Sequence, residues 1–85
     1  GVLYCLNPAD GAEYARYTTG GNIRATPAMG TANGPEVFVT SGDGHLYCFD
    51  QDNLGSYKWR ESIGQSAAIE LHSSPVIAPN GWVYV

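Results

Sequence analysis

The chain repeats itself along its length, and this repeat constrains the fold more than any other feature of the sequence. Residues 1–7, Gly-Val-Leu-Tyr-Cys-Leu-Asn, correspond at an offset of 43 to residues 44–50, Gly-His-Leu-Tyr-Cys-Phe-Asp. Self-similarity with a period of roughly 20–50 residues is the signature of repeat architectures such as solenoids and propellers. The sequence therefore predicts two copies of one structural unit, residues 1–43 and residues 44–85.

The offset between the two copies changes only between apolar segments. Gly11 and Arg16 align with Gly55 and Arg60 at an offset of 44. Two further matches join residues 25–28 to 73–76 and residues 37–39 to 83–85. Surface loops tolerate insertions of this kind and packed strands do not. The insertions are therefore expected in loops, with the apolar runs forming the packed part of each unit.

Short runs of β-branched and aromatic residues predict β-strands at residues 2–6, 37–40, 46–49 and 82–85. Turn-forming residues bound these runs at 33–35, 41–44 and 79–81. Asp43-Gly44 stands between two of the runs, and both residues tolerate positive φ, so a hairpin is expected there. No stretch shows a persuasive helical period. An all-β fold without helices follows.

Each copy offers four short strands that are apolar on both faces, which indicates a sheet packed between other layers. Four-stranded antiparallel sheets stacked on one another describe a β-propeller. The alternative is a two-sheet sandwich, which predicts stricter alternation of polar and apolar residues. In the propeller interpretation, the chain comprises two tandem repeats, starts on a third strand and ends on a second strand.

Composition excludes several classes of function. The net charge is −4 and the four basic residues are scattered along the chain, so the basic patch needed for nucleic acid is missing. No apolar run approaches the roughly 20 residues of a membrane-spanning helix. Two cysteines are too few for a disulfide framework. Cys5 and Cys48 occupy equivalent positions, and we interpret both as small buried apolar residues.

Residues 73–85 and 44–60 together resemble a repeat of the PQQ-like (quinoprotein-type) β-propeller family. The first segment, Ser-Ser-Pro-Val-Ile-Ala followed by Asn-Gly-Trp-Val-Tyr-Val, is similar to the inner two strands of that repeat. The second is similar to its outer two strands, with a small turn, Gly55 and a closing Trp59. The first copy departs from the pattern, because Ala15 stands where the second has Trp59. The resemblance implies a propeller fold and favours a periplasmic or extracellular location.

The enzymes of this family hold pyrroloquinoline quinone beside a calcium ion, with adjacent cysteines against the cofactor. This chain has no adjacent cysteine pair. The resemblance therefore implies a non-catalytic propeller module that acts as a scaffold or binding platform, without catalytic, cofactor-binding or metal-binding residues. The alternative is a fragment of a PQQ-dependent (quinoprotein) dehydrogenase whose cofactor shell other blades supply.

Arg24 and His72 are the candidate binding residues, because they occupy equivalent places at the start of the predicted innermost strand. In a propeller that position lies at the rim of the central channel, where ligands and partners dock. A second candidate, residues 50–61, imitates a calcium loop with acids at its first, third and last positions. Leu54 and Lys58 occupy ligand positions in it, so a polar turn is the preferred interpretation.

The expected partners are other copies of this chain or further blades of a longer parent chain. Stacked repeats do not bury their apolar faces alone, and about three or more are normally needed for stability. Two repeats leave sheet edges at residues 1–6 and 82–85 that invite pairing with another strand. No nucleic acid partner and no membrane span are expected.

Overall fold

A computed structural model describes residues 1–63 and 74–85, and these residues form β-strands and no helix. The all-β prediction is thereby confirmed for the described part of the chain. The strands are β1 (Val2–Leu6), β2 (Glu13–Thr18), β3 (Ala28–Gly30), β4 (Glu36–Thr40), β5 (His45–Asp50), β6 (Trp59–Ser62), β7 (Val76–Ile77) and β8 (Val83–Tyr84). Within the same residues, no helix is present that could cross a membrane.

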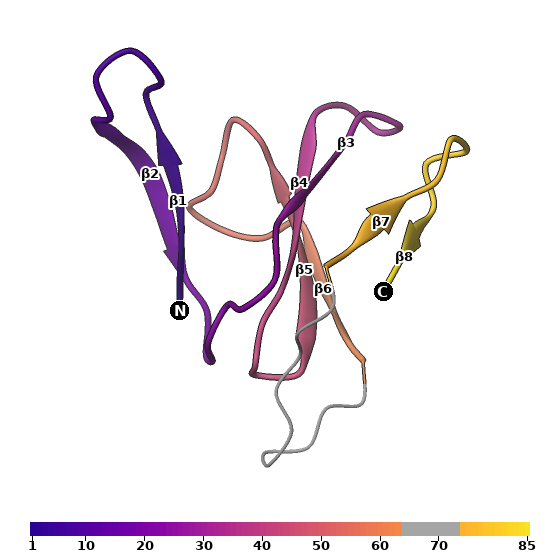
Figure 1. Ribbon diagram of the computed structural model, residues 1–85. Helices are drawn as coiled ribbons and strands as arrows, with labels where there is room; N and C mark the ends of the chain where they lie inside the picture. Colours follow the sequence, from indigo (N-terminus) through magenta and orange to yellow (C-terminus); the bar gives the residue numbers. More distant parts are fainter. Residues whose placement is uncertain (64–73) are drawn as a thin grey trace.

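The strands form three antiparallel sheets (Figure 1). A central sheet has the order β3-β4-β5-β6, the N-terminal hairpin is β1-β2, and the C-terminal hairpin is β7-β8. We had expected two four-stranded sheets, and the described residues contain one. The reason is that β3 and β4 belong to the first sequence copy and β5 and β6 to the second, so the central sheet is built across the boundary between the copies.

Strand pairing repeats with the sequence. The sequence repeat aligns the cross-strand pairs of β1-β2 with those of β5-β6. It aligns the cross-strand pairs of β3-β4 with those of β7-β8 in the same way. The corresponding pairs are Tyr4↔Arg16 with Tyr47↔Arg60, Cys5↔Ala15 with Cys48↔Trp59, Ala28↔Phe38 with Val76↔Tyr84, and Met29↔Val37 with Ile77↔Val83. One register therefore serves both copies, although their loops differ in length.

The turn that joins the outer strands corrects one detail of the sequence alignment. Asp10 Oδ1 accepts a hydrogen bond from the Ala12 N–H at 2.9 Å, and Asn53 Oδ1 accepts one from the Gly55 N–H at 3.1 Å. These matching Asx turns make Ala12, rather than Gly11, the structural equivalent of Gly55. The additional residue of the second copy therefore lies between Gly55 and β6.

The hairpin predicted at Asp43-Gly44 is confirmed. The Gly44 N–H donates to the Ser41 carbonyl at 3.1 Å, and the Ser41 N–H donates to the His45 carbonyl at 3.0 Å. Gly44 has a φ of 89°, which a residue with a Cβ adopts only at a cost. The turn connects β4 directly to β5 and so joins the two copies into one sheet.

The N-terminal hairpin covers one face of the central sheet. Leu3 lies in a buried cluster with residues of β4 and β5, namely Val39, Tyr47 and Phe49, and with Leu54 from the following loop. The Tyr17 ring of β2 packs against this cluster, with its centroid 4.9 Å from that of Phe49 and 5.8 Å from that of Tyr47. The hairpin removes the apolar residues of the facing strands from water, and this burial stabilises the packing.

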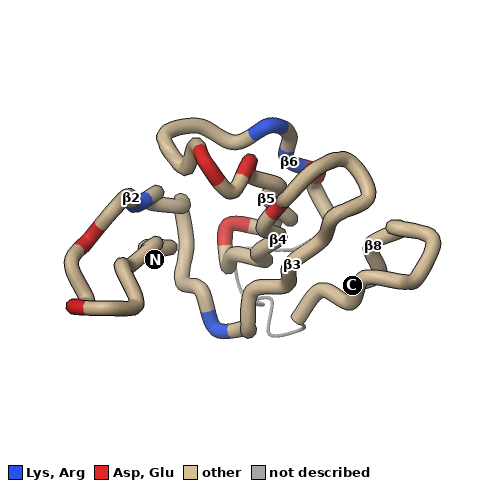
Figure 2. The backbone as a smooth tube through the Cα atoms, turned by 90° about the horizontal axis from the view of Figure 1, so that it is seen from above, with Lys and Arg blue, Asp and Glu red and all other residues tan. Residues whose placement is uncertain are grey.

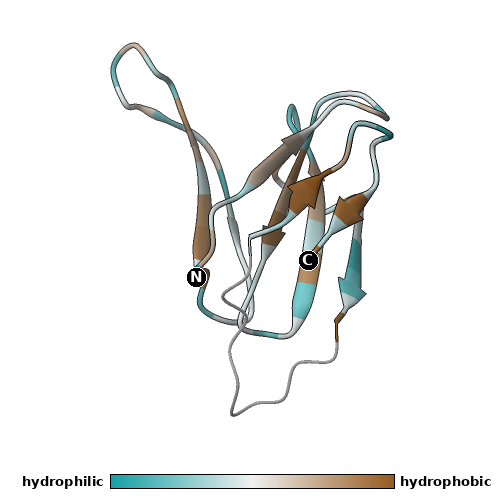
Figure 3. Cartoon of the chain, turned by 45° about the vertical axis from the view of Figure 1, so that its right-hand side comes forward, coloured by the Kyte–Doolittle hydropathy of each residue, from teal (hydrophilic) through white to brown (hydrophobic). Residues whose placement is uncertain are grey.

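The C-terminal hairpin covers the opposite face of the central sheet. Phe38, Leu46 and Cys48 form a second buried cluster, against which Ile77 and Val83 pack. Figure 3 shows the apolar stretches, in brown, concentrated in the strands of the three layers. Strands β4 and β5 are thus buried on both faces, whereas β6 is exposed along its length, and the molecule has a hairpin–sheet–hairpin order.

Strands β3 and β7, which the sequence repeat aligns, lie next to each other. Among the described strands, β3 and β7 are the pair from different sheets whose backbones approach one another. Just before them, the Thr26 N–H donates to Ser74 Oγ at 3.0 Å. Thr26 and Ser74 are aligned by the sequence repeat. The central sheet and the C-terminal hairpin are therefore joined through equivalent residues, on the side where β3 and β7 lie.

Candidate functional site

Of the two residues proposed for the channel rim, the structure describes one. Arg24 is exposed and lies in the segment between β2 and β3, four residues before β3 begins. His72 lies outside the described residues. The basic residues on β2, before β3 and around β6, blue in Figure 2, lie on different sides of the chain. Arg24 is thus not part of a larger basic patch in the described chain.

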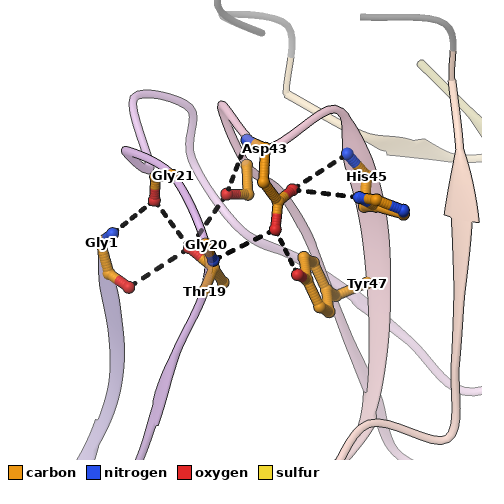
Figure 4. A network of polar contacts seen from close by, with 8 residues as sticks. Gly1, Thr19, Gly20, Gly21, Asp43, His45 and Tyr47 are labelled. Carbon is orange, nitrogen blue, oxygen red and sulfur yellow. Dashed lines mark hydrogen bonds and ion pairs between the residues drawn. The ribbon is translucent and has the colours of Figure 1, made fainter. Parts of the chain in front are cut away.

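Among the described residues, an extensive polar cluster surrounds Asp43, in the turn between β4 and β5 (Figure 4). Asp43 Oδ2 accepts hydrogen bonds from the Tyr47 hydroxyl and from the Gly20 N–H, the latter at 3.1 Å. Asp43 Oδ1 accepts the His45 N–H at 3.1 Å. Burial by itself would raise the pKa of Asp43, but the hydrogen bonds from Tyr47, Gly20 and His45 outweigh it and the net pKa is lowered. The carboxylate is therefore held in its charged form.

Two loops meet at this cluster, which we call the turn network and define as Thr19, Gly20, Ser41, Asp43 and Tyr47. Ser41 Oγ donates to Thr19 Oγ1 at 2.9 Å, across the junction between the N-terminal hairpin and the central sheet. Close approach of the backbones is possible because residue 21 is glycine: a Cβ there would lie 2.5 Å from the carbonyl carbon of residue 42. The turn network thus fixes the N-terminal hairpin against the central sheet.

Ser41 and Asp43 of the turn network lie close to the His45 side chain, but the three side chains are not arranged as a nucleophilic triad. Ser41 is fully buried and its hydroxyl donates to Thr19. His45 Nδ1 lies 3.4 Å from Asp43 Oδ1, so the histidine approaches the acid. A triad needs the imidazole to accept the proton of the nucleophile, and here the serine proton is directed to another hydroxyl. The cluster therefore acts as a structural connection.

A second charged group is buried at the other end of the central sheet. Glu36, on β4, is 5% exposed, and its Oε2 lies 2.6 Å from Lys58 Nζ. The Cys48 thiol, 3.5 Å away, donates to the same oxygen. Burial, together with the neighbouring Glu36 charge, raises the pKa of Cys48 to about 12. The thiol stays protonated at neutral pH, and a protonated thiol is a poor nucleophile.

The described residues do not fit a quinone–calcium site. Among residues 1–63 and 74–85, no group of three or more His, Cys, Asp and Glu side chains is placed to hold a metal ion. Cys5 lies on β1 and Cys48 on β5, in different sheets, and both are free thiols. In the calcium-like loop, Asp50 Oδ1 accepts the Asp52 N–H at 2.9 Å and Leu54 is buried. These residues shape a turn and fill the core.

Sequence reasoning did not identify the two charged clusters. The Asp43-Gly44 pair predicted a turn, but the partners of Asp43 come from positions more than twenty residues earlier as well as from β5. Nothing in the local pattern distinguishes Glu36 from an exposed acid.

No family model matches the chain, and no curated protein matches it either.

Proposed function

We propose that this chain is part of a β-propeller of the PQQ-like type and serves as a non-catalytic scaffold or binding platform. One observation carries the proposal. The pairing register of β1-β2 matches that of β5-β6, and the register of β7-β8 matches that of β3-β4. The two hairpins pack on opposite faces of the four-stranded central sheet. A propeller is built from such sheets, stacked around a common axis. In this proposal the central sheet is one complete blade and each hairpin is half of a neighbouring blade.

The approach of β3 and β7 supports a common axis. In the proposal each is the first strand of its blade, and the first strand is innermost in a propeller of this type. Arg24 and His72 precede those strands in sequence and belong, in the proposal, to the rim of the central channel. A partner that docks at this rim would meet one basic side chain or one imidazole from each successive unit.

The charged groups support the non-catalytic part of the proposal. Asp43 accepts hydrogen bonds from the loop and strand that it joins, and Glu36 is paired with Lys58. The Cys48 thiol is protonated and buried. Each of these groups contributes to the connection between strands or layers. Function follows from sites rather than from folds, so binding through exposed loops is the role that this arrangement favours.

Titration with pyrroloquinoline quinone and calcium tests the proposal against the dehydrogenase alternative. We expect no saturable change in the melting temperature of the chain. A ligand at 100 times its dissociation constant adds about 2.7 kcal/mol of stability, which would raise the melting temperature by several degrees. Calcium alone and quinone alone serve as controls. A saturable shift that needs both would overturn the non-catalytic assignment.

A further inference from the structure

Two corresponding turns of the chain each contain an Asn-Gly pair. Asn33-Gly34 lies in the turn between β3 and β4, and Asn80-Gly81 lies in the turn between β7 and β8. Both glycines have a φ of 88°, and the N–H of each donates to the carbonyl three residues earlier. An asparagine followed by glycine is prone to lose its side-chain amide, because glycine has no Cβ to hinder attack by its own backbone nitrogen.

The hydrogen bonds of the two turns differ. Asn80 Oδ1 accepts the Trp82 N–H at 3.0 Å, whereas the Asn33 side chain makes no hydrogen bond to the described residues. The Gly81 nitrogen lies 2.8 Å from its acceptor oxygen. The Gly34 nitrogen lies 3.3 Å from its own acceptor, which is longer than the usual distance of about 2.9–3.0 Å. The turn at Asn33 is therefore held less firmly than the turn at Asn80.

The packing around the two glycines differs in the same direction. Gly34 is exposed, and no described atom beyond its chain neighbours lies within 4 Å of the position that a Cβ would occupy. Gly81 is half-buried, and a Cβ there would lie 2.4 Å from the Cβ of Ala32. Attack requires the asparagine side chain to swing onto the following backbone nitrogen, which distorts the turn locally. The Gly34 backbone has room for this distortion, whereas Gly81 is held against a neighbour.

We propose that Asn33 is a site of spontaneous deamidation in the folded chain and that the fold protects Asn80. The Gly34 nitrogen gives its proton to hydroxide and attacks Asn33 Cγ. The bond from Cγ to the side-chain nitrogen breaks, and that nitrogen takes up a proton and leaves as ammonia. Water then opens the cyclic imide at one of its two carbonyls, which produces aspartate or isoaspartate at position 33. The steps are a substitution and a hydrolysis, so water is the only co-reactant.

The modification changes both the charge and the backbone of the turn between β3 and β4. Either product adds one carboxylate to a chain whose net charge is already −4. Isoaspartate also lengthens the main chain by one methylene shortly before Glu36, which is paired with Lys58. Gly30 faces Glu36 at the end of the strand pair that this turn closes. We therefore expect the isoaspartyl form to pair less firmly at this end of β3 and β4.

Three other asparagines of the described chain serve as internal controls. Asn7 precedes a proline, which has no N–H and whose nitrogen carries a ring. Asn22 and Asn53 precede isoleucine and leucine, whose side chains hinder the attack. Asn53 Oδ1 also accepts the Gly55 N–H at 3.1 Å. We expect these three to stay unmodified over the period in which Asn33 reacts.

Incubation of the unsubstituted chain in mildly alkaline buffer, followed by peptide mass spectrometry, tests the proposal. Trypsin cleaves after residues 24, 58 and 60, so the two Asn-Gly pairs fall in different peptides. Conversion at Asn33 should be about tenfold faster than at Asn80, because Asn80 has to break two hydrogen bonds of ordinary net strength before it reacts. Equal conversion at the two sites, or faster conversion at Asn80, would overturn the inference.

The same measurement in urea supplies the control for the fold. Unfolding removes the hydrogen bonds and the packing, so both Asn-Gly pairs should then react at similar rates. A difference that persists in urea would assign the rates to the flanking residues and overturn the structural explanation. An Asn33 that stays intact in the folded chain while the unfolded chain reacts would also refute the proposal. Asn33→Gln, which closes a larger ring slowly, should remove the acidic species that ion exchange separates from the incubated folded chain.

Discussion

Phe49→Ala is expected to lower the free energy of unfolding by about 3–5 kcal/mol, the usual range for removing a buried phenylalanine ring. Phe49 is fully buried between the central sheet and the N-terminal hairpin, with its ring stacked on Tyr47 and tilted against Tyr17. Small domains are stable by about 5–15 kcal/mol in total, so the substitution removes a large part of the stability. Urea denaturation followed by tryptophan fluorescence measures the change.

Tyr14→Ala is the matched control for the loss of an aromatic ring. Tyr14 is 72% exposed on β2 of the same hairpin, and exposed substitutions usually change stability by less than about 0.5 kcal/mol. The layered structure requires a large difference between the two variants. Equal losses at Phe49 and Tyr14 would contradict the burial of Phe49 between two layers.

Asp43→Asn is expected to lower the free energy of unfolding by about 2 kcal/mol at pH 7, because hydrogen bonds to a charged group each contribute about 1.5–3 kcal/mol. The substitution keeps the size of the side chain and removes the charge that the Tyr47 hydroxyl and the Gly20 and His45 N–H groups stabilise. The amide NH2 group of the new asparagine is itself a donor, and it faces hydroxyl and N–H groups that are donors too. The two loops joined by the turn network should loosen.

The pH dependence of stability gives this variant a sharper signature. The pKa of Asp43 is lowered in the folded chain, so its contribution to stability is present above the unfolded pKa of about 3.9 and is lost as the pH falls through the folded value. Denaturation at pH 7 and at pH 3 should show the difference between the wild type and Asp43→Asn shrinking at pH 3. Asp52→Asn, at an exposed position, is the control. An undiminished difference at pH 3 would argue against the charged hydrogen bonds.

Strand positions and turns could be predicted from the sequence because they depend on local chemistry. The apolar runs at β1, β4, β5 and β8 alternate with turn-forming residues, and Asp43-Gly44 supplies the positive φ that its hairpin requires. The burial of β4 and β5 on both faces was also predictable, since neither strand has a polar face. The sequence repeat then aligned the residues that pair in each hairpin.

The grouping of strands into sheets could not be predicted so directly. The repeat defines equivalent residues but not where one sheet ends, and the 41–44 turn joins β4 to β5 across the boundary between copies. The sequence alone was equally compatible with two separate four-stranded sheets. The turn network shows the same limit for side chains, because Asp43 finds Gly20 only after the sheets have stacked.

The two hairpins pack on opposite faces of one four-stranded sheet, and the stacked arrangement depends on this packing. Nuclear Overhauser spectroscopy on the 85-residue chain tests this claim directly. The structure predicts cross-peaks between the rings of Tyr17 and Phe49, and between Val83 methyl protons and the cluster of Phe38, Leu46 and Cys48. Absence of either set, or cross-peaks joining Tyr17 to Val83, would contradict the layered arrangement.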